Sequence, residues 1–238
     1  MTDFASHHAI PARRRKSAST GLLFALATLV LLIVGGAAFV ALVLWPRWPS
    51  AAVAPDAPSL PITVGGVLFN VPPAAIRMAM QRLPGAQERL DLAFLWPSLE
   101  PPGPTKLAPT ETIPPIDRVF VTVEPQSIAL APSERVKSIY PRYLAEMQYD
   151  APDGLKVIPF REGTPYQSED LFFDPAAQPG FVVRCSRPGA AGTPGMCLYE
   201  RRIESVDVTL RFPSDWLGQW RAVNDGIGKL MGRLRPGG

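Results

Sequence analysis

Two cysteines, Cys185 and Cys197, are the residues of this 238-residue chain with the most restricted chemistry. They stand twelve positions apart, so they do not form the C-x-x-C motif of thiol oxidoreductases. Two thiols also fall short of the four ligands of a structural zinc site. Each cysteine borders a predicted strand, and both follow a segment that we expect to direct export into an oxidising compartment. We therefore predict a structural disulfide, which would stabilise the fold by about 3 kcal/mol in the chain-entropy model.

Histidine, a frequent general base and metal ligand, is confined to His7 and His8. The rest of the chain therefore lacks the histidine of a Ser-His-Asp triad, a Cys-His pair or an H-E-x-x-H zinc site. An adjacent histidine pair on a short tail is also a poor metal chelate. The chain has no G-x-S-x-G motif and no P-loop, and no G-x-G-x-x-G motif follows a predicted strand. We therefore predict no catalytic residue, no metal site and no cofactor.

Carboxylates remain as candidate catalytic groups, and they cluster at Glu169, Asp170 and Asp174, with Glu162 upstream. A glycosidase needs two carboxylates held several ångströms apart across a sugar. A calcium site needs a spaced, oxygen-rich loop, which this segment lacks. We interpret the cluster as a solvated strand edge or turn. A carboxylate-dependent hydrolase of envelope polysaccharide is retained as an alternative function.

An apolar segment at residues 21–45 determines the compartment in which these groups are placed. It contains no charged residue and no proline. As a helix it would be about 37 Å long, which exceeds the roughly 30 Å hydrocarbon core of a bilayer. A single segment satisfies its backbone polar groups in lipid only as a helix. We predict one retained transmembrane signal anchor; a cleaved signal peptide is the alternative, because Ala52, Val53 and Ala54 have the small-x-small form of a cleavage site.

The two flanks of this segment differ in charge. The basic residues on its N-terminal side are Arg13, Arg14, Arg15 and Lys16. Because cytoplasmic flanks carry the excess of lysine and arginine, we predict a cytoplasmic N-terminus and an exported C-terminal part. Trp45 and Trp48 suit the headgroup level, where we expect them to anchor the helix. Gly35 and Gly36 permit close helix packing, so we also consider a homo-oligomer formed through this helix.

The net charge of +3 reflects the membrane anchor rather than the exported part. Five of the 24 basic residues and one of the 21 acidic residues lie in the first fifty positions, which leaves 19 basic and 20 acidic residues beyond them. A domain with this balance has no global field to attract nucleic acid. We therefore predict the membrane and a protein of the cell envelope as partners, and no nucleic acid.

Composition divides the chain into four parts. These are a cytoplasmic basic tail at 1–20, the transmembrane helix at 21–45, a proline-rich linker at 46–61 and a periplasmic α+β domain at 62–238. The linker composition favours an extended, semi-rigid spacer. A second proline-rich stretch at 97–115 shows no periodicity, and we interpret it as a mobile connector. A proline-rich ligand for a partner protein is the alternative interpretation of that stretch.

Short apolar strands dominate the domain. Predicted strands cover 62–71, 89–96, 118–124, 155–160, 169–173, 181–185, 197–201 and 206–212, and predicted helices cover 74–83, 132–147 with a break near Pro141, and the region after Pro213. Short connections between consecutive strands favour antiparallel pairing. We predict an α+β fold in which an antiparallel sheet is covered on one side by two or three helices, including the C-terminal one. Arg201 and Arg202 should face opposite sides of their strand, which argues against one anion site.

The C-terminal helix has the clearest apolar face. Ser214 is expected at its N-cap and Asp215 in its first turn. The apolar residues at helical spacing are Trp216, Leu217, Trp220, Val223, Ile227, Leu230, Met231 and Leu234. We predict that this stripe packs on the sheet. An amphipathic helix lying on the membrane surface is the alternative.

Together these features resemble the small anchored envelope proteins of proteobacteria, a resemblance that implies no particular activity. The sequence predicts a single-pass protein of the bacterial inner membrane with a periplasmic C-terminal domain. We predict a non-catalytic role through protein contacts, such as that of an accessory subunit of an envelope complex. Besides the hydrolase, a ligand-binding sensor ectodomain is the remaining alternative.

Overall fold

The computed structural model describes residues 18–44, 53–54, 56–103, 116–176, 180–189 and 195–236. The chain forms two compact units, Met1–Trp48 and Pro49–Gly238. Several predictions fall on residues outside the described ranges. These are the topology determinants Arg13, Arg14, Arg15 and Lys16, the anchors Trp45 and Trp48, residues 46–52 and 55 of the linker, and residues 104–115 of the second proline-rich stretch.

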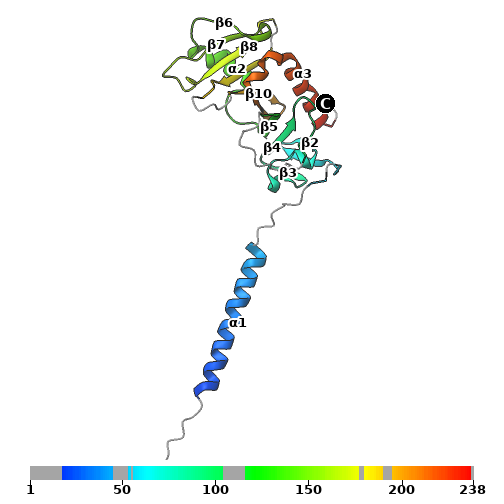
Figure 1. The fold of residues 1–238 in the computed structure, drawn as a ribbon, viewed down its shortest axis with the longest axis vertical. Coiled ribbons are helices and arrows are strands. Elements are labelled where there is room, and N and C mark those ends of the chain that lie inside the picture. The colour runs from blue at the N-terminus through cyan, green and yellow to red at the C-terminus, as the bar shows by residue number, and fades with distance from the viewer. Residues whose placement is uncertain are drawn as a thin grey trace, which may run out of the picture. The chain divides into compact units, whose positions relative to one another are not determined.

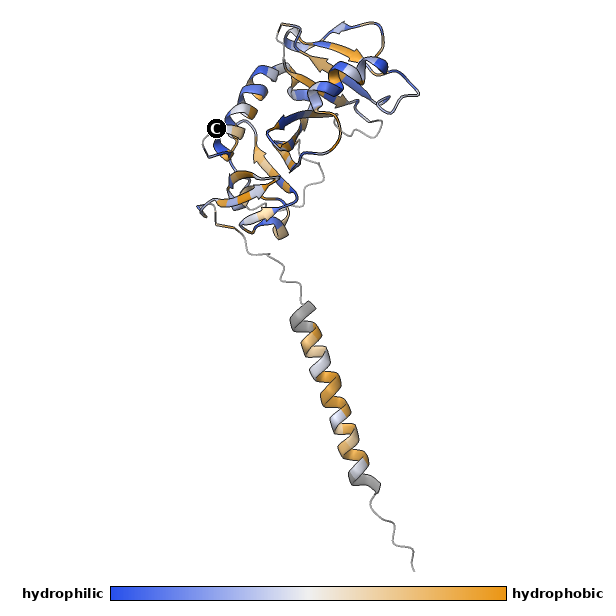
Figure 2. Ribbon diagram, turned by 180° about the vertical axis from the view of Figure 1, so that it is seen from behind, coloured by the Kyte–Doolittle hydropathy of each residue, from blue (hydrophilic) through white to orange (hydrophobic). Residues whose placement is uncertain are grey.

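The first unit contains one long helix, α1 (Ala18–Leu44), which confirms the predicted helix (Figure 1). Its segment Gly21–Val40 is long and apolar enough to cross a membrane. Apolar residues occur on all of its sides rather than on one stripe (Figure 2), as expected of a helix surrounded by lipid. The Thr28 hydroxyl donates a hydrogen bond to the Phe24 carbonyl oxygen at 2.9 Å, so this polar group is satisfied within the helix.

The second unit is built on an eight-stranded, wholly antiparallel sheet in the order β4-β5-β11-β10-β9-β8-β7-β6. Its strands are β4 (Leu90–Leu95), β5 (Arg118–Pro125), β6 (Tyr149–Asp150), β7 (Lys156–Pro159), β8 (Glu169–Phe173), β9 (Val182–Ser186), β10 (Met196–Ile203) and β11 (Val206–Pro213). The predicted α+β class and the antiparallel pairing of these strands are confirmed (Figure 1). Strand β4 was expected to be half-buried, but five of its six residues are buried. Leu90, Leu92 and Phe94 belong to the main core, and the Asp91 side chain is bonded to Gln81 and Arg89.

A second, three-stranded sheet precedes the large one in sequence. It contains β1 (Leu60–Val64), β2 (Val67–Val71) and β3 (Gly85–Gln87), in the order β2-β1-β3. The predicted single strand 62–71 is therefore a hairpin, with Gly65 (φ +54°) and Gly66 (φ +86°) in its turn. Strands β1 and β3 pair in parallel, which is an exception to the antiparallel expectation. A Cβ atom on Gly65 would lie 2.8 Å from the Ser205 carbonyl oxygen, so this contact also requires glycine.

The predicted helix at 74–83 is wrong. The segment forms two single 3₁₀ turns, η1 (Pro73–Ala75) and η2 (Ala79–Gln81). Between them the backbone of Ile76 is extended and forms an antiparallel bridge with Leu92 of β4. Pairing with the sheet edge therefore overrides the local helix preference.

The predicted helix at 132–147 is shorter than expected. It forms α2 (Pro132–Ser138), followed by the 3₁₀ turn η3 (Tyr140–Arg142) at the expected break around Pro141. Beyond the break, Leu144 forms a bridge with Phe160 instead of continuing the helix. The turn expected at 150–154 contains the 3₁₀ turn η4 (Pro152–Gly154).

The described part of the stretch 97–115 is not a mobile connector throughout. Leu99 is 7 % exposed and belongs to the main core. Its carbonyl oxygen accepts a hydrogen bond from the Arg233 guanidinium at 2.7 Å. The start of this stretch is therefore packed against the C-terminal helix.

The C-terminal segment folds as a 3₁₀ turn, η5 (Ser214–Gln219), followed by α3 (Trp220–Leu234). The predicted N-cap at Ser214 is wrong: its amide donates to the Gly195 carbonyl oxygen, and Gln219 precedes α3. The predicted stripe is buried, apart from Trp216, which is partly buried. Its buried members are Leu217, Trp220, Val223, Ile227, Leu230, Met231 and Leu234. This burial confirms packing in the core and contradicts a helix lying on the membrane.

Helices contact both faces of the large sheet, which corrects the expectation that they cover one side. On β10, Tyr199 donates a hydrogen bond to the Asn224 side chain of α3 at 3.0 Å. The next residue, Glu200, pairs with Arg135 of α2 at 3.0 Å. Because successive strand residues point to opposite faces, α3 and α2 lie on opposite sides of β10. The main core fills the α3 side, and it includes the buried face of the small sheet.

Candidate interaction surface

The face of the large sheet opposite α3 is polar over its central strands β5, β11 and β10. Cross-strand register places Thr122 opposite Thr209, and Thr209 opposite Glu200. We call this surface the open face. It comprises Phe120, Thr122, Glu124, Leu198, Glu200, Arg202, Asp207, Thr209 and Arg211, none of which is fully buried. The alternate residues of the same strands, such as Val121 and Leu210, are buried in the main core.

One end of the open face is organised around Asp207. Its carboxylate pairs with the Arg202 guanidinium at 2.7 Å and accepts hydrogen bonds from the amide and hydroxyl of Ser127. The Arg202 ion pair, together with the Ser127 amide, lowers the pKa of Asp207 below its usual value. Arg202 also donates to the Ala129 carbonyl oxygen at 3.2 Å. These bonds fix the connection between β5 and α2 against this end of the sheet.

Two apolar side chains project from that connection. Leu130 is 46 % exposed and lines an open surface depression of about 240 Å³, together with Glu200, Thr209 and other residues of the open face. Ile128, two positions earlier, is fully exposed. Exposed apolar side chains at the border of a polar surface are typical of sites that contact another protein.

The opposite end of the open face is basic and aromatic. The Arg77 guanidinium lies over the Phe120 ring, 4.7 Å from its centroid. On the other side of Phe120, the register places Arg211 directly opposite it. Arg118, two residues before Phe120, pairs with Asp117 at 2.7 Å. Among the described residues, no carboxylate forms an ion pair with Arg77 or Arg211. We call Arg77, Phe120 and Arg211 the arginine–phenylalanine site.

The edge of strand β4 is covered by the segment that contains Ile76, Arg77 and Gln81. The Asp91 carboxylate pairs with Arg89 at 2.8 Å and accepts hydrogen bonds from Gln81 and Thr122. Gln81 in turn accepts the Asp91 amide hydrogen at 2.9 Å, while the Arg77 amide donates to the Asp91 carbonyl oxygen. The Arg89 hydrogen bond lowers the pKa of Asp91. Because these backbone groups are already satisfied, β4 presents little edge to an incoming strand, and the open face is the more accessible surface.

The acidic cluster proposed from the sequence does not form one site. Glu169 pairs with Arg184 at 2.5 Å, whereas Asp170 pairs with Arg187 at 2.7 Å on the other face of β8. Asp174 accepts a hydrogen bond from the Ala176 amide, and Glu162 is exposed. The residues that the structure describes contain no group of three His, Cys, Asp or Glu side chains suited to a metal ion.

Arg184 connects the acidic residues to the α2 side of the sheet. Its guanidinium reaches both Glu169 and Glu200, and it lies over the rings of Tyr140 and Tyr166 at 5.5 Å and 5.0 Å. Tyr140 and Phe160 form a small second core with Leu171. This arrangement holds the α2–η3 segment on the sheet, so we assign it a structural role.

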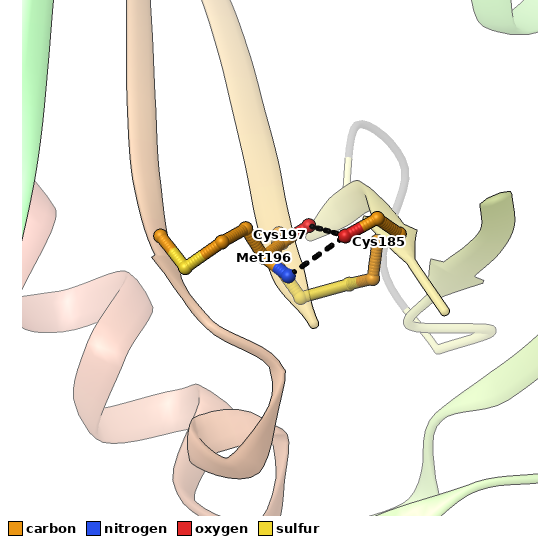
Figure 3. The surroundings of a disulfide bond; sticks show 4 residues. Cys185, Met196 and Cys197 are labelled. Carbon is orange, nitrogen blue, oxygen red and sulfur yellow. Dashed lines mark hydrogen bonds between the residues drawn. A yellow bond between two sulfur atoms is a disulfide. The ribbon is translucent and has the colours of Figure 1, made fainter. Parts of the chain in front are cut away.

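The structure contains the disulfide between Cys185 and Cys197 (Figure 3). The two residues lie directly opposite each other on β9 and β10, with their Cα atoms 3.9 Å apart, and both are buried. Beside the bridge, the Met196 amide donates to the Ser186 hydroxyl oxygen at 2.9 Å (Figure 3). The bridge and this hydrogen bond together fix both ends of the loop that connects the two strands.

Sequence reasoning found the strands of the open face but not its composition. Arg202 and Arg201 do separate as predicted, with Arg202 bonded to Asp207 and Arg201 over the Tyr199 ring at 5.1 Å. The pairing of Phe120 with Arg211 was missed because ninety-one positions separate the two residues. The sequence indicated only which residues of the two strands face outward. The register between the strands decides which of those residues become neighbours.

Two solved structures are similar to this chain. The immunity protein Smlt3025 of the Stenotrophomonas maltophilia type IV secretion system has 12 % identity and a TM-score of 0.53, with 75 % of this chain and 94 % of that chain covered. The iron-regulated outer membrane lipoprotein FrpD of Neisseria meningitidis has 8 % identity and a TM-score of 0.42, with 77 % and 93 % covered. No family model and no curated protein sequence matches the chain. The first of these similarities shows a shared fold.

Proposed function

We propose that this chain is a non-catalytic, membrane-anchored protein that acts in the periplasm by binding another protein. The observation that carries the proposal is the open face, where Phe120 and Leu198 stay half-exposed between charged residues at one end and the exposed side chains of Ile128 and Leu130 border the other end. Protein interfaces combine exposed apolar and aromatic groups with arginine in this way. The face also lies on rigid, paired strands, which lowers the entropy lost on binding.

The N-terminal unit supports the location. α1 is long and apolar enough to cross a bilayer, and the sequence places the basic cluster Arg13–Lys16 before it. By the positive-inside rule, this charge distribution favours a cytoplasmic N-terminus and a periplasmic domain. The disulfide supports the same orientation, because disulfides persist in an oxidising compartment.

The fold similarity supports a binding role more than an enzymatic one. Smlt3025 is an immunity protein of a secretion system, and the fold similarity covers 75 % of this chain. We therefore expect the partner to be a protein that enters or resides in the envelope, and we favour an immunity-type role in which the open face covers part of that protein.

The alternative functions have weaker support. A carboxylate-dependent hydrolase needs two available acids, but Glu169 and Asp170 are both paired with arginine and point to opposite faces of β8. A ligand-binding sensor needs an enclosed apolar pocket, whereas the depression beside Leu130 is small, open and lined by charged residues.

Crosslinking in intact membranes followed by mass spectrometry tests the proposal. The full chain should capture a discrete envelope protein that a control chain of residues 1–61 does not capture. If the control captures the same proteins, the anchor and not the domain mediates the contact. Recovery of no protein beyond the control would contradict the proposed function. A product of twice the chain mass in both samples would indicate self-association through α1.

A further inference from the structure

We propose that the arginine–phenylalanine site is where an acidic side chain of the partner protein docks. This inference rests on the proposed function and adds the chemistry of the contact. Arg77 and Arg211 flank Phe120 on the open face, one over its ring and one in the opposing register position. Arginine presents a planar set of donors that matches a carboxylate in a bidentate arrangement.

Within the described residues, Arg77 and Arg211 combine an unpaired guanidinium with a place beside Phe120 on the open face. Arg82, Arg142, Arg161 and Arg201 also form no ion pair within the described residues, but none of these four belongs to the open face. Among the described residues, most arginines pair with a carboxylate. The paired arginines are Arg89, Arg118, Arg135, Arg184, Arg187, Arg202, Arg221, Arg233 and Arg235. Arg77 and Arg211 are exposed, and within the described residues no ion pair involves them. They therefore keep their charge available to an acidic group that comes from outside.

The surroundings favour a protein carboxylate over an extended polyanion. The aromatic ring of Phe120 and the half-exposed Leu198, which lies opposite Arg211 on β10, provide apolar contact around the charges. At the other end of the face, Glu124 pairs with Arg89 and Asp207 pairs with Arg202, so among the described residues no unpaired basic charge continues along the face for an anionic chain to follow. Nucleic acid and anionic lipid surfaces bind instead to larger basic tracks. Arginine beside an aromatic group is also a frequent hot-spot composition in protein interfaces.

A zero-length crosslink tests the chemistry directly. Carbodiimide joins an amine to a carboxylate only where the two groups touch, so Arg211→Lys in the full chain introduces a reactive amine at the site. In intact membranes, we expect a peptide that joins position 211 to an aspartate or glutamate of another protein. The native amine of Lys229, exposed on α3, is the matched internal control and should give no such link.

A charge reversal provides the second measurement. A photocrosslinking amino acid at Thr209, in the middle of the open face, should yield a discrete product with the partner. In that background Arg211→Glu should reduce the yield at least about tenfold, and Arg211→Lys should retain most of it. Lys229→Glu is the matched reversal on the opposite side of the sheet and should leave the yield unchanged.

The outcomes separate this inference from the proposed function. If a partner is captured but Arg211→Glu leaves its yield unchanged, the docking site is wrong and the binding role stands. A link from position 211 to lipid, or to a carboxylate in a second copy of this chain, also overturns the inference. If no position of the domain captures any protein, the proposed function itself fails.

Discussion

Gly226 of α3 lies against the indole ring of Trp96, so closely that a Cβ atom at position 226 would be 2.7 Å from Cζ3 of that ring. Trp96 follows β4 and stacks on Trp216 with ring centroids 5.4 Å apart. The close approach of helix and ring therefore depends on the absence of a side chain at this glycine. Alanine normally stabilises a helix relative to glycine, so the packing and the helix propensity oppose each other here.

We predict that Gly226→Ala lowers the free energy of unfolding by about 1–3 kcal/mol, because the clash with Trp96 outweighs the gain in helix propensity. Gly228→Ala is the matched control, since no atom lies within 4 Å of a Cβ at that position. It should be neutral or stabilising by up to about 1 kcal/mol. Denaturant unfolding of the full chain in detergent, followed by tryptophan fluorescence, measures both. Equal effects of the two substitutions would show that Trp96 does not restrict α3.

The disulfide predicts that no thiol is free. Labelling of the denatured, unreduced protein should modify neither Cys185 nor Cys197, and labelling after reduction should modify both. Replacing both cysteines by serine should lower the free energy of unfolding by about 3 kcal/mol, because the twelve-residue separation is no longer constrained in the unfolded chain. Stoichiometric labelling before reduction would contradict the bridge.

The pKa of Asp207 predicts a contribution to stability that depends on pH. Because its pKa is lowered in the folded state, the contribution is complete above the unfolded value of about 3.9 and is lost as the pH falls through the folded pKa. We expect Asp207→Asn to cost about 1–2 kcal/mol at pH 7. The difference between variant and parent should shrink as the pH falls below about 4. A difference that stays constant from pH 7 to pH 2 would mean that the charge on Asp207 does not contribute.

The proposed orientation predicts which part of the chain a protease can digest. Protease added to spheroplasts should remove the domain at residues 62–238 and leave the basic tail at 1–20 protected by the membrane. An epitope at each terminus, detected by immunoblotting, measures the two parts separately. Intact cells, whose outer membrane excludes the protease, are the control. A protected C-terminal epitope in spheroplasts would reverse the proposed orientation.

Hydrophobic periodicity was sufficient to identify the strands and helices that have one apolar and one polar face. The alternation around Val119, Val121 and Val123 identified β5, and the apolar stripe from Leu217 to Leu234 identified the C-terminal helix. In both cases local pattern and tertiary packing agree, because one side is buried and the other is not. The bridge between the two cysteines could be predicted because they border neighbouring strands in a domain that the sequence predicts to be exported.

Two features that the sequence did not predict depend on pairing between segments that are distant in the chain. The segment around Ile76 has the composition of a helix, but its bridge to Leu92 holds it extended along the edge of β4. The arginine–phenylalanine site depends on the register between β5 and β11, and the alternation of each strand is compatible with several registers. Periodicity therefore identified which residues of a strand face outward, whereas their neighbours on that surface depend on tertiary structure.

A disulfide and a pair of hydrogen bonds join β9 and β10 at the end where the connecting segment begins. The alignment of the two strands therefore does not depend on that segment. Since Cys185, Cys197 and the Ser186–Met196 hydrogen bonds hold the two strand ends together, the strands keep their alignment whatever peptide connects Gly189 to Gly195. A peptide tag or fluorophore acceptor sequence inserted there should leave the sheet intact. This connection is therefore a suitable attachment point for following the protein in living cells.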